Sequence, residues 1–498
     1  MIYRLLNFNQ EAFVLQIHKA RNVRSYNQDQ IQLFPPSVQS LIEAEDLCMV
    51  VNDVVKTLDL SCLYDKLSSE GNPAYHPAMM LKIYFYAYAR GIFSSRRIAR
   101  ALKENIAFIF LAAWQKPNFR TISDFRKNNL KELGLLFAQI VGLCQRLGMV
   151  KPGHIAIDGT KIKANASEAN TYDGERIEKE IQRWLDHAEA IDRQEDALYG
   201  PEKTGDELPE DIRDPEKRIK KLKELKKKLD AGGSEKINKT DPDAVFMKTT
   251  NGIKTSYNAQ AAVDAEHQVV VAADVTNDAA DVEQLLPMIA QTEENTSQKV
   301  KECSADSGYS SGENLKAVAG REIDAYIPDR EYQARQRGKP PGDFDKENFV
   351  YDQRRDCYIC VEGEELHFSH LQKRKNKEPL RIYRGKNCHA CQFFGLCTSS
   401  KTGRSISRHP YEKELRQMRC KLDSESGKAI YGKRKYTVEP PFGHIKSIMG
   451  FTGFQLRGKQ KVTAEFKLVS IAHNLRKIWF HLKANGKNLA EMCPAPGC

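Results

Sequence analysis

Three acidic residues are placed so that their carboxylates could act together on a phosphodiester. Asp158 and Asp306 each end a short apolar run, and each is followed by glycine within two residues. Glu439 follows a basic stretch and precedes Pro440–Pro441. Gathered carboxylates raise one another's pKa, and a divalent cation removes that cost. Oxygen ligands favour Mg²⁺ or Mn²⁺, which can activate a nucleophile and stabilise a leaving oxygen. Taken singly, each acid is more simply a helix cap or a salt-bridge partner.

A cluster of cysteines is the second chemical feature. Five of the twelve lie close together: Cys357, Cys360, Cys388, Cys391 and Cys397. Nothing in the sequence points to an oxidising compartment, so the cluster indicates metal binding, with free thiols as the alternative. Cys360, Cys388, Cys391 and Cys397 would give a structural four-thiolate Zn²⁺ site, and Cys357 is an alternative ligand because Cys357–x2–Cys360 is the sharper spacing.

Charge is distributed unevenly along the 498 residues, whose net charge is +11. Residues 370–487 hold 27 Lys and Arg against 7 Asp and Glu, so the rest of the chain is net acidic. A basic C-terminal third indicates a surface for a polyanion, although a solvated basic face is the simpler alternative. We find no apolar run long enough for a membrane span and no signal peptide, so we expect a cytoplasmic protein.

The elements before the first acid are predicted to be helical. Residues 25–150 carry helical periodicity, with helices over Leu41–Leu58, His76–Arg90 and Ser95–Lys103. Ser94 is a predicted N-cap, and Thr121 with Asp124 resembles a capping box for the next helix. The arginines on the third helix, Arg96, Arg97 and Arg100, suit either DNA binding or the basic surface of a helical bundle.

Beyond this region the pattern becomes α/β. Strands are predicted at His154–Ile157, Ser256–Val263, His267–Val275, Val300–Ala305 and Ala325–Ile327, with a helix over Ala280–Ala290. This order predicts a mixed sheet over residues 151–330, in which Asp158 and Asp306 both stand at carboxyl ends of strands.

Two insertions interrupt the α/β region. Residues 173–235 are charged and helical, and two apolar stripes predict a helical hairpin whose second helix begins at Asp214–Pro215. A solvated hairpin is favoured over one that docks on DNA. Residues 331–430 contain the cysteines, and we expect them to lack a compact core without Zn²⁺.

Three segments resemble the DDE transposases of bacterial insertion sequences. They are Ile157–Ser167, Ala305–Tyr309 and Tyr431–Lys446, the last of which resembles the Tyr/Arg/Glu/Lys signature of that superfamily. The likeness extends to Tyr257–Gln260, His473–Leu475 and the helical segment from His76 to Arg126, and it covers about residues 25–485.

The resemblance implies an α/β fold with an RNase H-like catalytic core completed by residues 431–485. It implies catalysis by Asp158, Asp306 and Glu439 with Mg²⁺, and contacts to transposon-end DNA from Tyr431, Arg434 and Lys446. The partners implied are terminal inverted repeats and target DNA, bound by a homodimer, and residues 25–150 would bind DNA or dimerise. The subgroup of these transposases that the chain resembles carries a cysteine cluster before the catalytic Glu.

Two departures from the family pattern leave questions open. Arg434 precedes Glu439 by four intervening residues where the superfamily has three, so Lys435 is an alternative, and residues 1–24 have no counterpart. The function alternatives are a non-catalytic, zinc-containing DNA-binding derivative of such an element and a general metal-dependent nuclease. An intact set of three acids argues against the first, and strand joining would separate a transposase from the second.

Overall fold

The computed structural model describes residues 37–493 apart from 68–69, 71–72, 152, 200–209, 233–234, 250–251, 337, 339–341 and 375–376. Residues 1–24 and the first part of the predicted helical domain lie outside this range. By its internal contacts the chain divides into two units, Met1–Glu43 and Ala44–Cys498. The described part of the first unit forms one 3-10 turn, Val38–Leu41, whose N-cap is Ser37. All the other described helices and strands belong to the second unit.

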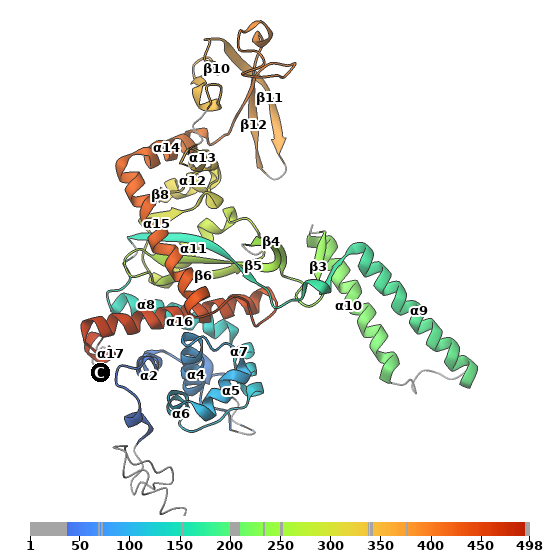
Figure 1. Cartoon of the computed structure of the whole chain (residues 1–498), viewed down its shortest axis with the longest axis vertical. Coiled ribbons are helices and arrows are strands. Elements are labelled where there is room, and N and C mark those ends of the chain that lie inside the picture. Colours follow the sequence, from blue (N-terminus) through green and yellow to red (C-terminus); the bar gives the residue numbers. More distant parts are fainter. Residues whose placement is uncertain are drawn as a thin grey trace, which may run out of the picture. The chain divides into compact units, whose positions relative to one another are not determined.

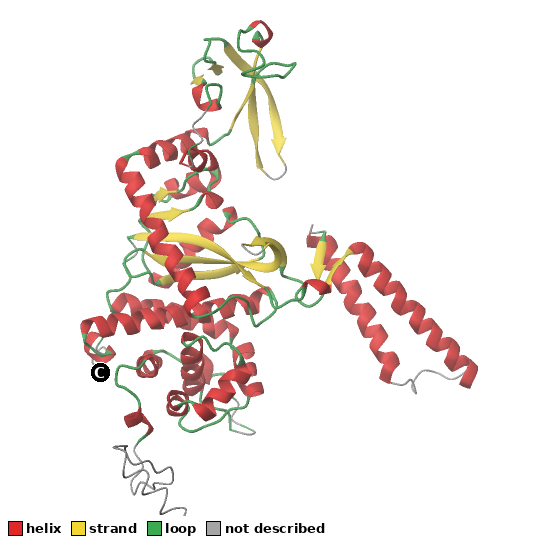
Figure 2. Cartoon of the chain, in the orientation of Figure 1, coloured by secondary structure: helices red, strands yellow, loops and turns green. Residues whose placement is uncertain are grey.

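Helices fill the chain from Leu47 to Arg146, which confirms the predicted helical region (Figure 2). They are α2 (Leu47–Thr57), α3 (Ser61–Tyr64), α4 (Pro77–Ala89), α5 (Ser95–Glu104), α6 (Ile106–Leu111), α7 (Phe119–Asn128) and α8 (Leu130–Arg146). The side chains of α4 are buried on almost every face, because α2, α6 and the C-terminal helix α16 (Lys459–Asn485) all pack against it. A helix that is apolar all round belongs in a core, so α4 is buried more completely than the helical periodicity of residues 76–90 predicts.

One of the predicted helix starts is wrong. The side chain of Asn118 accepts hydrogen bonds from the N–H groups of Arg120 and Thr121, so α7 begins at Phe119 and not at a Thr121–Asp124 capping box. Ser94 does occupy the N-cap of α5, but its side chain makes no capping hydrogen bond.

A six-stranded mixed sheet follows, and it confirms the α/β class (Figure 1). Its strands are β1 (His154–Lys163), β4 (Val245–Thr249), β5 (Gly252–Asp264), β6 (Val270–Thr276), β7 (Glu302–Ala305) and β8 (Asp324–Tyr326), in the order β4-β5-β1-β7-β8 with β6 on β5. β1, β7 and β8 are parallel, whereas β5 is antiparallel to each of its neighbours. Helices α11 (Leu285–Thr296) and α16 pack on β6, and α15 (Glu425–Gly443) packs on β1 and β7.

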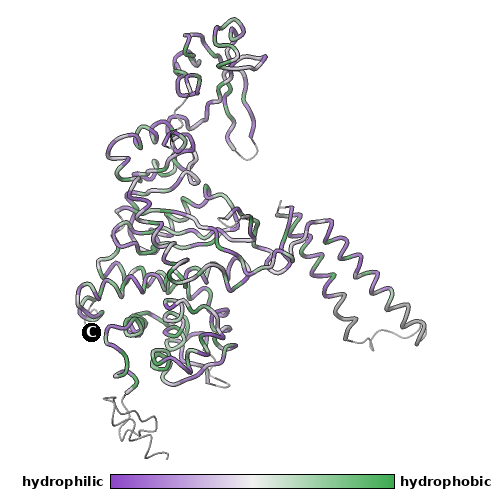
Figure 3. Tube along the Cα trace, in the orientation of Figure 1, coloured by the Kyte–Doolittle hydropathy of each residue, from purple (hydrophilic) through white to green (hydrophobic). Residues whose placement is uncertain are grey.

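The first insertion forms the predicted helical hairpin. After β2 (Thr171–Asp173) come α9 (Gly174–Tyr199) and α10 (Glu210–Gly232), and β3 (Lys236–Asn238) returns to pair with β2. α10 therefore begins four residues before the predicted start. Ile177 packs with Leu222, Leu225 and Leu229 in one buried cluster. Figure 3 shows how hydrophilic the rest of both helices is, which fits a solvated hairpin.

The second insertion folds around an apolar cluster of its own. Its strands are β9 (Val350–Asp352), β10 (Cys357–Ile359), β11 (Glu365–Arg374), β12 (Lys377–Gly385) and β13 (Ser405–Arg408), which form an antiparallel sheet. One cluster lies beneath it: Phe349, Tyr358, Leu366, Tyr383 and Ile406. These mostly aromatic side chains bury apolar surface, and Cys360 and Cys397 pack against the same cluster.

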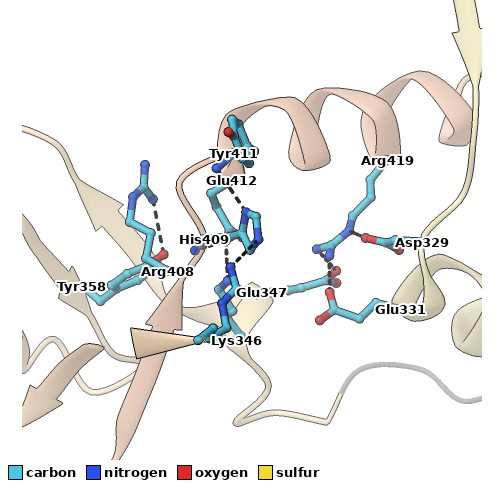
Figure 4. A network of polar contacts seen from close by, with 11 residues as sticks. Asp329, Glu331, Lys346, Glu347, Tyr358, Arg408, His409, Tyr411, Glu412 and Arg419 are labelled. Atoms are coloured by element: carbon cyan, nitrogen blue, oxygen red, sulfur yellow. Dashed lines mark hydrogen bonds and ion pairs between the residues drawn. The ribbon is translucent and has the colours of Figure 1, made fainter. Parts of the chain in front are cut away.

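Charged groups connect the beginning and the end of this insertion. Arg419, on α14 (Glu412–Asp423), forms ion pairs with Asp329 and Glu331 and with Glu347 at 3.1 Å (Figure 4). Lys346 pairs with Glu412 at 2.6 Å in the same network. The Arg419 side chain is only 16% exposed. Its ion pairs are therefore stronger than solvent-exposed ion pairs, which water screens.

The chain after α14 carries the last sequence motif. α15 continues into a π-helical turn, His444–Ile448, directly after Pro440 and Pro441. α16 follows, and the short α17 (Leu489–Met492) ends the described chain. Among the described residues no helix is long and apolar enough to cross a membrane.

Candidate active site

Asp158 and Asp306 occupy equivalent places on neighbouring parallel strands. The parallel pairing of β1 with β7 ends at Ile157 and Ala305, so each aspartate is the first residue beyond that pairing. The expectation that β1 ends at Asp158 was wrong, because β1 continues to Lys163 along the antiparallel strand β5, with Asp158 opposite Ala261. One aspartate is thus fixed within a strand, and the other opens the turn that follows its strand.

The Asp158 carboxyl is desolvated and lies against an arginine. Burial raises its pKa to about 6; Arg434 acts in the opposite direction, and Asp306 raises the pKa further. An Arg434 Nη2 lies 3.0 Å from Asp158 Oδ2, and the Arg434 side chain is 9% exposed. Because two carboxylates share this corner with one cation, the site can accept more positive charge.

The other two residues of the last motif lie near the same corner. Lys446 Nζ donates to Thr160 Oγ1, two residues beyond Asp158 on β1, and burial lowers the pKa of Lys446 while Asp158 opposes that effect. Burial raises the pKa of Tyr431, and both Arg434 and Asp306 act on it. Lys435, the alternative to Arg434, is exposed.

Glu439 is not gathered with the two aspartates. It lies on α15, but the face of that helix turned to the protein carries Arg434, Val438 and Phe442, and Glu439 is exposed. Within the described chain Glu439 forms no hydrogen bond or ion pair, and no three His, Cys, Asp or Glu side chains are arranged to hold a metal ion. The structure therefore brings together five of the six predicted residues.

Asp281 is a carboxylate near this site that the sequence analysis missed. Its Oδ1 accepts hydrogen bonds from Asn258 Nδ2 at 2.6 Å and Gln260 Nε2 at 2.8 Å, and it lies 3.3 Å from Lys161 Nζ. Gln260 in turn accepts from the buried hydroxyl of Tyr309. Asp281 lies five residues beyond the end of β6 and not directly after an apolar run, so the reasoning that selected Asp158 and Asp306 does not reach it.

The glycines after the two aspartates leave room for Asp281. A Cβ on Gly159 would lie 2.3 Å from Gln260 Nε2 and 2.8 Å from Asp281 Oδ1. A Cβ on Gly308 would lie 2.9 Å from Asp306 Oδ1 and 3.1 Å from Asp281 Oδ2. A Cβ at Gly159 would therefore displace the side chains of Gln260 and Asp281, and Asp281 lies close to the glycines that follow both aspartates.

Four of the five clustered cysteines line one small cavity of about 40 Å³, although among the described residues no three of them are arranged to hold a metal ion. The four are Cys360, Cys388, Cys391 and Cys397. Burial raises the pKa of Cys397, and the other three thiols add to that effect. The Arg404 backbone N–H donates to Cys388 Sγ at 3.3 Å, and that sulfur in turn donates to the Gly385 carbonyl oxygen at 3.7 Å. Cys357 is fully buried, and the groups that act on its pKa are charged side chains of the sheet and not the other thiols.

A mixed sheet that presents a desolvated carboxylate and a second, partly exposed one beside a buried arginine and a lysine fits the class of enzymes that act on phosphate esters. Comparison with protein families narrows this class. Residues 359–479 match the family model described as transposase DDE domain, and residues 36–128 match the one described as transposase domain (DUF772). No curated protein matches the chain. The two family matches indicate a DDE transposase of an insertion sequence, which confirms the resemblance drawn from the sequence motifs.

Proposed function

We propose that this transposase binds the terminal inverted repeats of its element, cleaves the DNA at the element ends and joins the 3′ ends to target DNA. The observation that supports the proposal most directly is the pair Asp158 and Asp306 at the end of the β1–β7 pairing, with Arg434 on one of them. In this proposal the mixed sheet is an RNase H-like core, and residues 25–150, 151–330, 331–430 and 431–485 act as separate functional parts.

The acidic pair fits a divalent cation by its chemistry. Both groups are hard oxygen donors, and the raised pKa of Asp158 records a desolvation and repulsion that a cation would relieve. Asp158 and Asp306 would hold Mg²⁺ or Mn²⁺, with Glu439 proposed as a further ligand on its sequence motif. When bound, the cation supplies activation of the attacking oxygen and stabilisation of the leaving oxygen.

The side chains around the pair supply binding and orientation. Arg434 is held in a buried position from which its guanidinium can donate to a phosphate as well as to Asp158. Lys446, anchored at Thr160, adds a second cation on the same face of β1. Tyr431 can stack on or hydrogen-bond to a nucleotide. These three are the proposed contacts to the end of the element.

The cysteine quartet is proposed to hold one structural Zn²⁺. Four thiols at one cavity, one of them receiving a backbone N–H, are the donor set that Zn²⁺ prefers. Because the insertion already has an apolar core, the ion would fix the segment from Gly385 to Arg404 and not the whole sheet. A homodimer in the complex with both DNA ends completes the proposal.

The test compares cleavage with binding in single variants. Asp158→Asn, Asp306→Asn and Glu439→Gln should each abolish Mg²⁺-dependent cleavage of duplexes taken from the DNA that flanks the coding region. Binding of the same duplexes, followed by fluorescence anisotropy, should be retained. Glu425→Gln is the matched control, because Glu425 is also an exposed glutamate of α15.

Two outcomes would contradict the proposal. Near wild-type cleavage by any of the three variants would remove that residue from the active site. A pre-cleaved end that is never joined to a second duplex would make the protein a nuclease and not a transposase.

A further inference from the structure

A basic groove lies between the N-terminal helices and the core, away from the acidic pair. Its volume is about 940 Å³. One side is formed by residues 93–96 at the start of α5 and by α7, and the other by Asn165 and residues 455–457 before α16. Arg96, Arg120 and Arg457 line it together with Asp124, which pairs with Lys127. Within the described chain none of the three arginines has a carboxylate partner, although Arg457 donates to the Asn165 carbonyl.

The start of α5 is built against its own helix dipole. Its first turn carries Arg96 and Arg97 and no acidic residue, although the N-terminus of a helix favours negative charge. The Ser94 side chain leaves the first N–H groups uncapped. Arg126 also lines the groove, is 5% exposed, and leaves its Nε without a partner among the described residues. Each of these features points to an anion in the groove.

An aromatic ring holds two of the arginines in place. The guanidinium carbons of Arg96 and Arg120 lie 5.2 Å and 5.8 Å from the centre of the Phe119 ring, which is 39% exposed. Such stacking fixes the planar groups, so less entropy is lost when they bind a phosphate.

The two sides of the groove are connected rigidly. Glu465 of α16, fully buried, accepts from the N–H groups of Gln455 and Leu456 at 3.0 Å and 2.9 Å, and it pairs with Arg126 of α7 at 3.5 Å. Asn165 donates to the Gln455 carbonyl at 2.6 Å. A ligand in the groove is therefore held at a fixed distance from β1.

Asn165 is the seventh residue after Asp158, so at about 3.3 Å per residue the groove begins no more than about 23 Å from Asp158. A duplex advances about 3.4 Å per base pair, so this span corresponds to about six or seven base pairs at most. We propose that the groove binds the sugar-phosphate backbone of the element's DNA about six base pairs from the point of cleavage. The inference rests on the proposed function, because it places the cleaved bond at Asp158.

The experiment measures binding against duplex length and salt. Duplexes from the DNA that flanks the coding region are shortened on the element side from about 16 to about 4 base pairs, with the rest of the probe unchanged. Wild-type affinity should fall sharply when this side becomes shorter than about six base pairs. In Arg96→Gln/Arg120→Gln/Arg457→Gln the fall should disappear, and the slope of log K against log salt should flatten by about 0.9 for each lost phosphate contact.

The control is Arg321→Gln, which removes an exposed arginine that does not line the groove. It should bind like the wild type, and circular dichroism should show that every variant is folded. A triple variant that keeps the length dependence and the salt slope would overturn the proposal. A loss in the control variant of about one third of the loss in the triple variant would also overturn it, because the effect would then scale with the number of charges removed.

Cleavage by Asp158→Asn separates this inference from the proposed function. If Asp158→Asn cleaves normally while the triple variant loses length-dependent binding, the active-site proposal fails and the groove stands. If Asp158→Asn is inactive and the triple variant binds like the wild type, the groove fails and the active-site proposal stands.

Discussion

The buried pair of Arg126 and Glu465 links α7 to α16, and its removal gives a sharp test of how the helical region is fixed to the core. Arg126 is 5% exposed and Glu465 is fully buried. Arg126 donates to the hydroxyl of Tyr88 at 2.5 Å, and that hydroxyl lies 3.3 Å from Glu465. Burial raises the pKa of Glu465, and Arg126 lowers it.

Replacing only the arginine should cost more than replacing both partners. Arg126→Met leaves a buried carboxylate that retains only neutral donors, and loss of one partner of a buried pair costs about 3–5 kcal/mol. Adding Glu465→Gln removes the stranded charge, and its amide oxygen can still accept from Gln455 and Leu456. The double variant should therefore be more stable than Arg126→Met by about 1–3 kcal/mol.

The assay is urea unfolding of the full chain, followed by far-UV circular dichroism at pH 7 and pH 5. The deficit of Arg126→Met should shrink at pH 5. Without Arg126 the pKa of Glu465 rises further above its unfolded value, so the variant is most stable where this carboxyl is protonated and loses stability as pH rises. A double variant less stable than Arg126→Met, together with a deficit independent of pH, would refute this reasoning.

Three further predictions concern single positions. Gly159→Ala should destabilise the protein by about 1–3 kcal/mol in thermal or urea unfolding, because its Cβ would displace the Gln260–Asp281 hydrogen bond; a variant as stable as the wild type would show that the strand can shift. Burial lowers the pKa of His473 to about 3, so only the unfolded chain gains a proton at this residue as the pH falls below about 6.5. The free energy of unfolding should therefore drop by about 2 kcal/mol between pH 7 and pH 5. His473→Leu should remove that part of the pH dependence. Cys388→Ser should release the proposed Zn²⁺ and expose the chain near Gly385 to protease, while Cys357→Ser should keep the metal; equal metal content in both would contradict the quartet.

The parts of the fold that the sequence predicts are those set by local patterns. β1, β5 and β7 are apolar runs bounded by turn residues, so their presence and the acids beside them could be predicted. The continuation of β1 to Lys163 could not, because Gly159–Lys163 is polar and becomes a strand only through its pairing with β5. The start of α7 was misplaced for a different reason. Asn118 and Thr121 are both residue types that cap helices, and the sequence does not show which of them does so.

Asp281 and the core of the cysteine-rich insertion depend on contacts between distant segments. Asp281 meets Asn258 and Gln260 only because β5 pairs with β6, the strand that precedes Asp281 in the sequence. The cluster around Tyr383 joins strands whose spacing in sequence is irregular, and the basic composition of this segment masked it. Long-range packing of this kind leaves no periodic signal in the sequence.

Glu439 and Lys446 show why motif spacing alone does not determine orientation. Seven residues make about two turns of a regular helix, so the two side chains would share one face if the helix were uniform. Here Pro440 and Pro441 remove two N–H donors, and the chain continues as a π turn, which has more residues per turn. Lys446 consequently contacts Thr160 beside Asp158, whereas Glu439 faces solvent. Glu439 can therefore act together with Asp158 and Asp306 only if the segment from Glu439 to Lys446 rotates about its helix axis. The cleavage activity of Glu439→Gln measures whether Glu439 takes part.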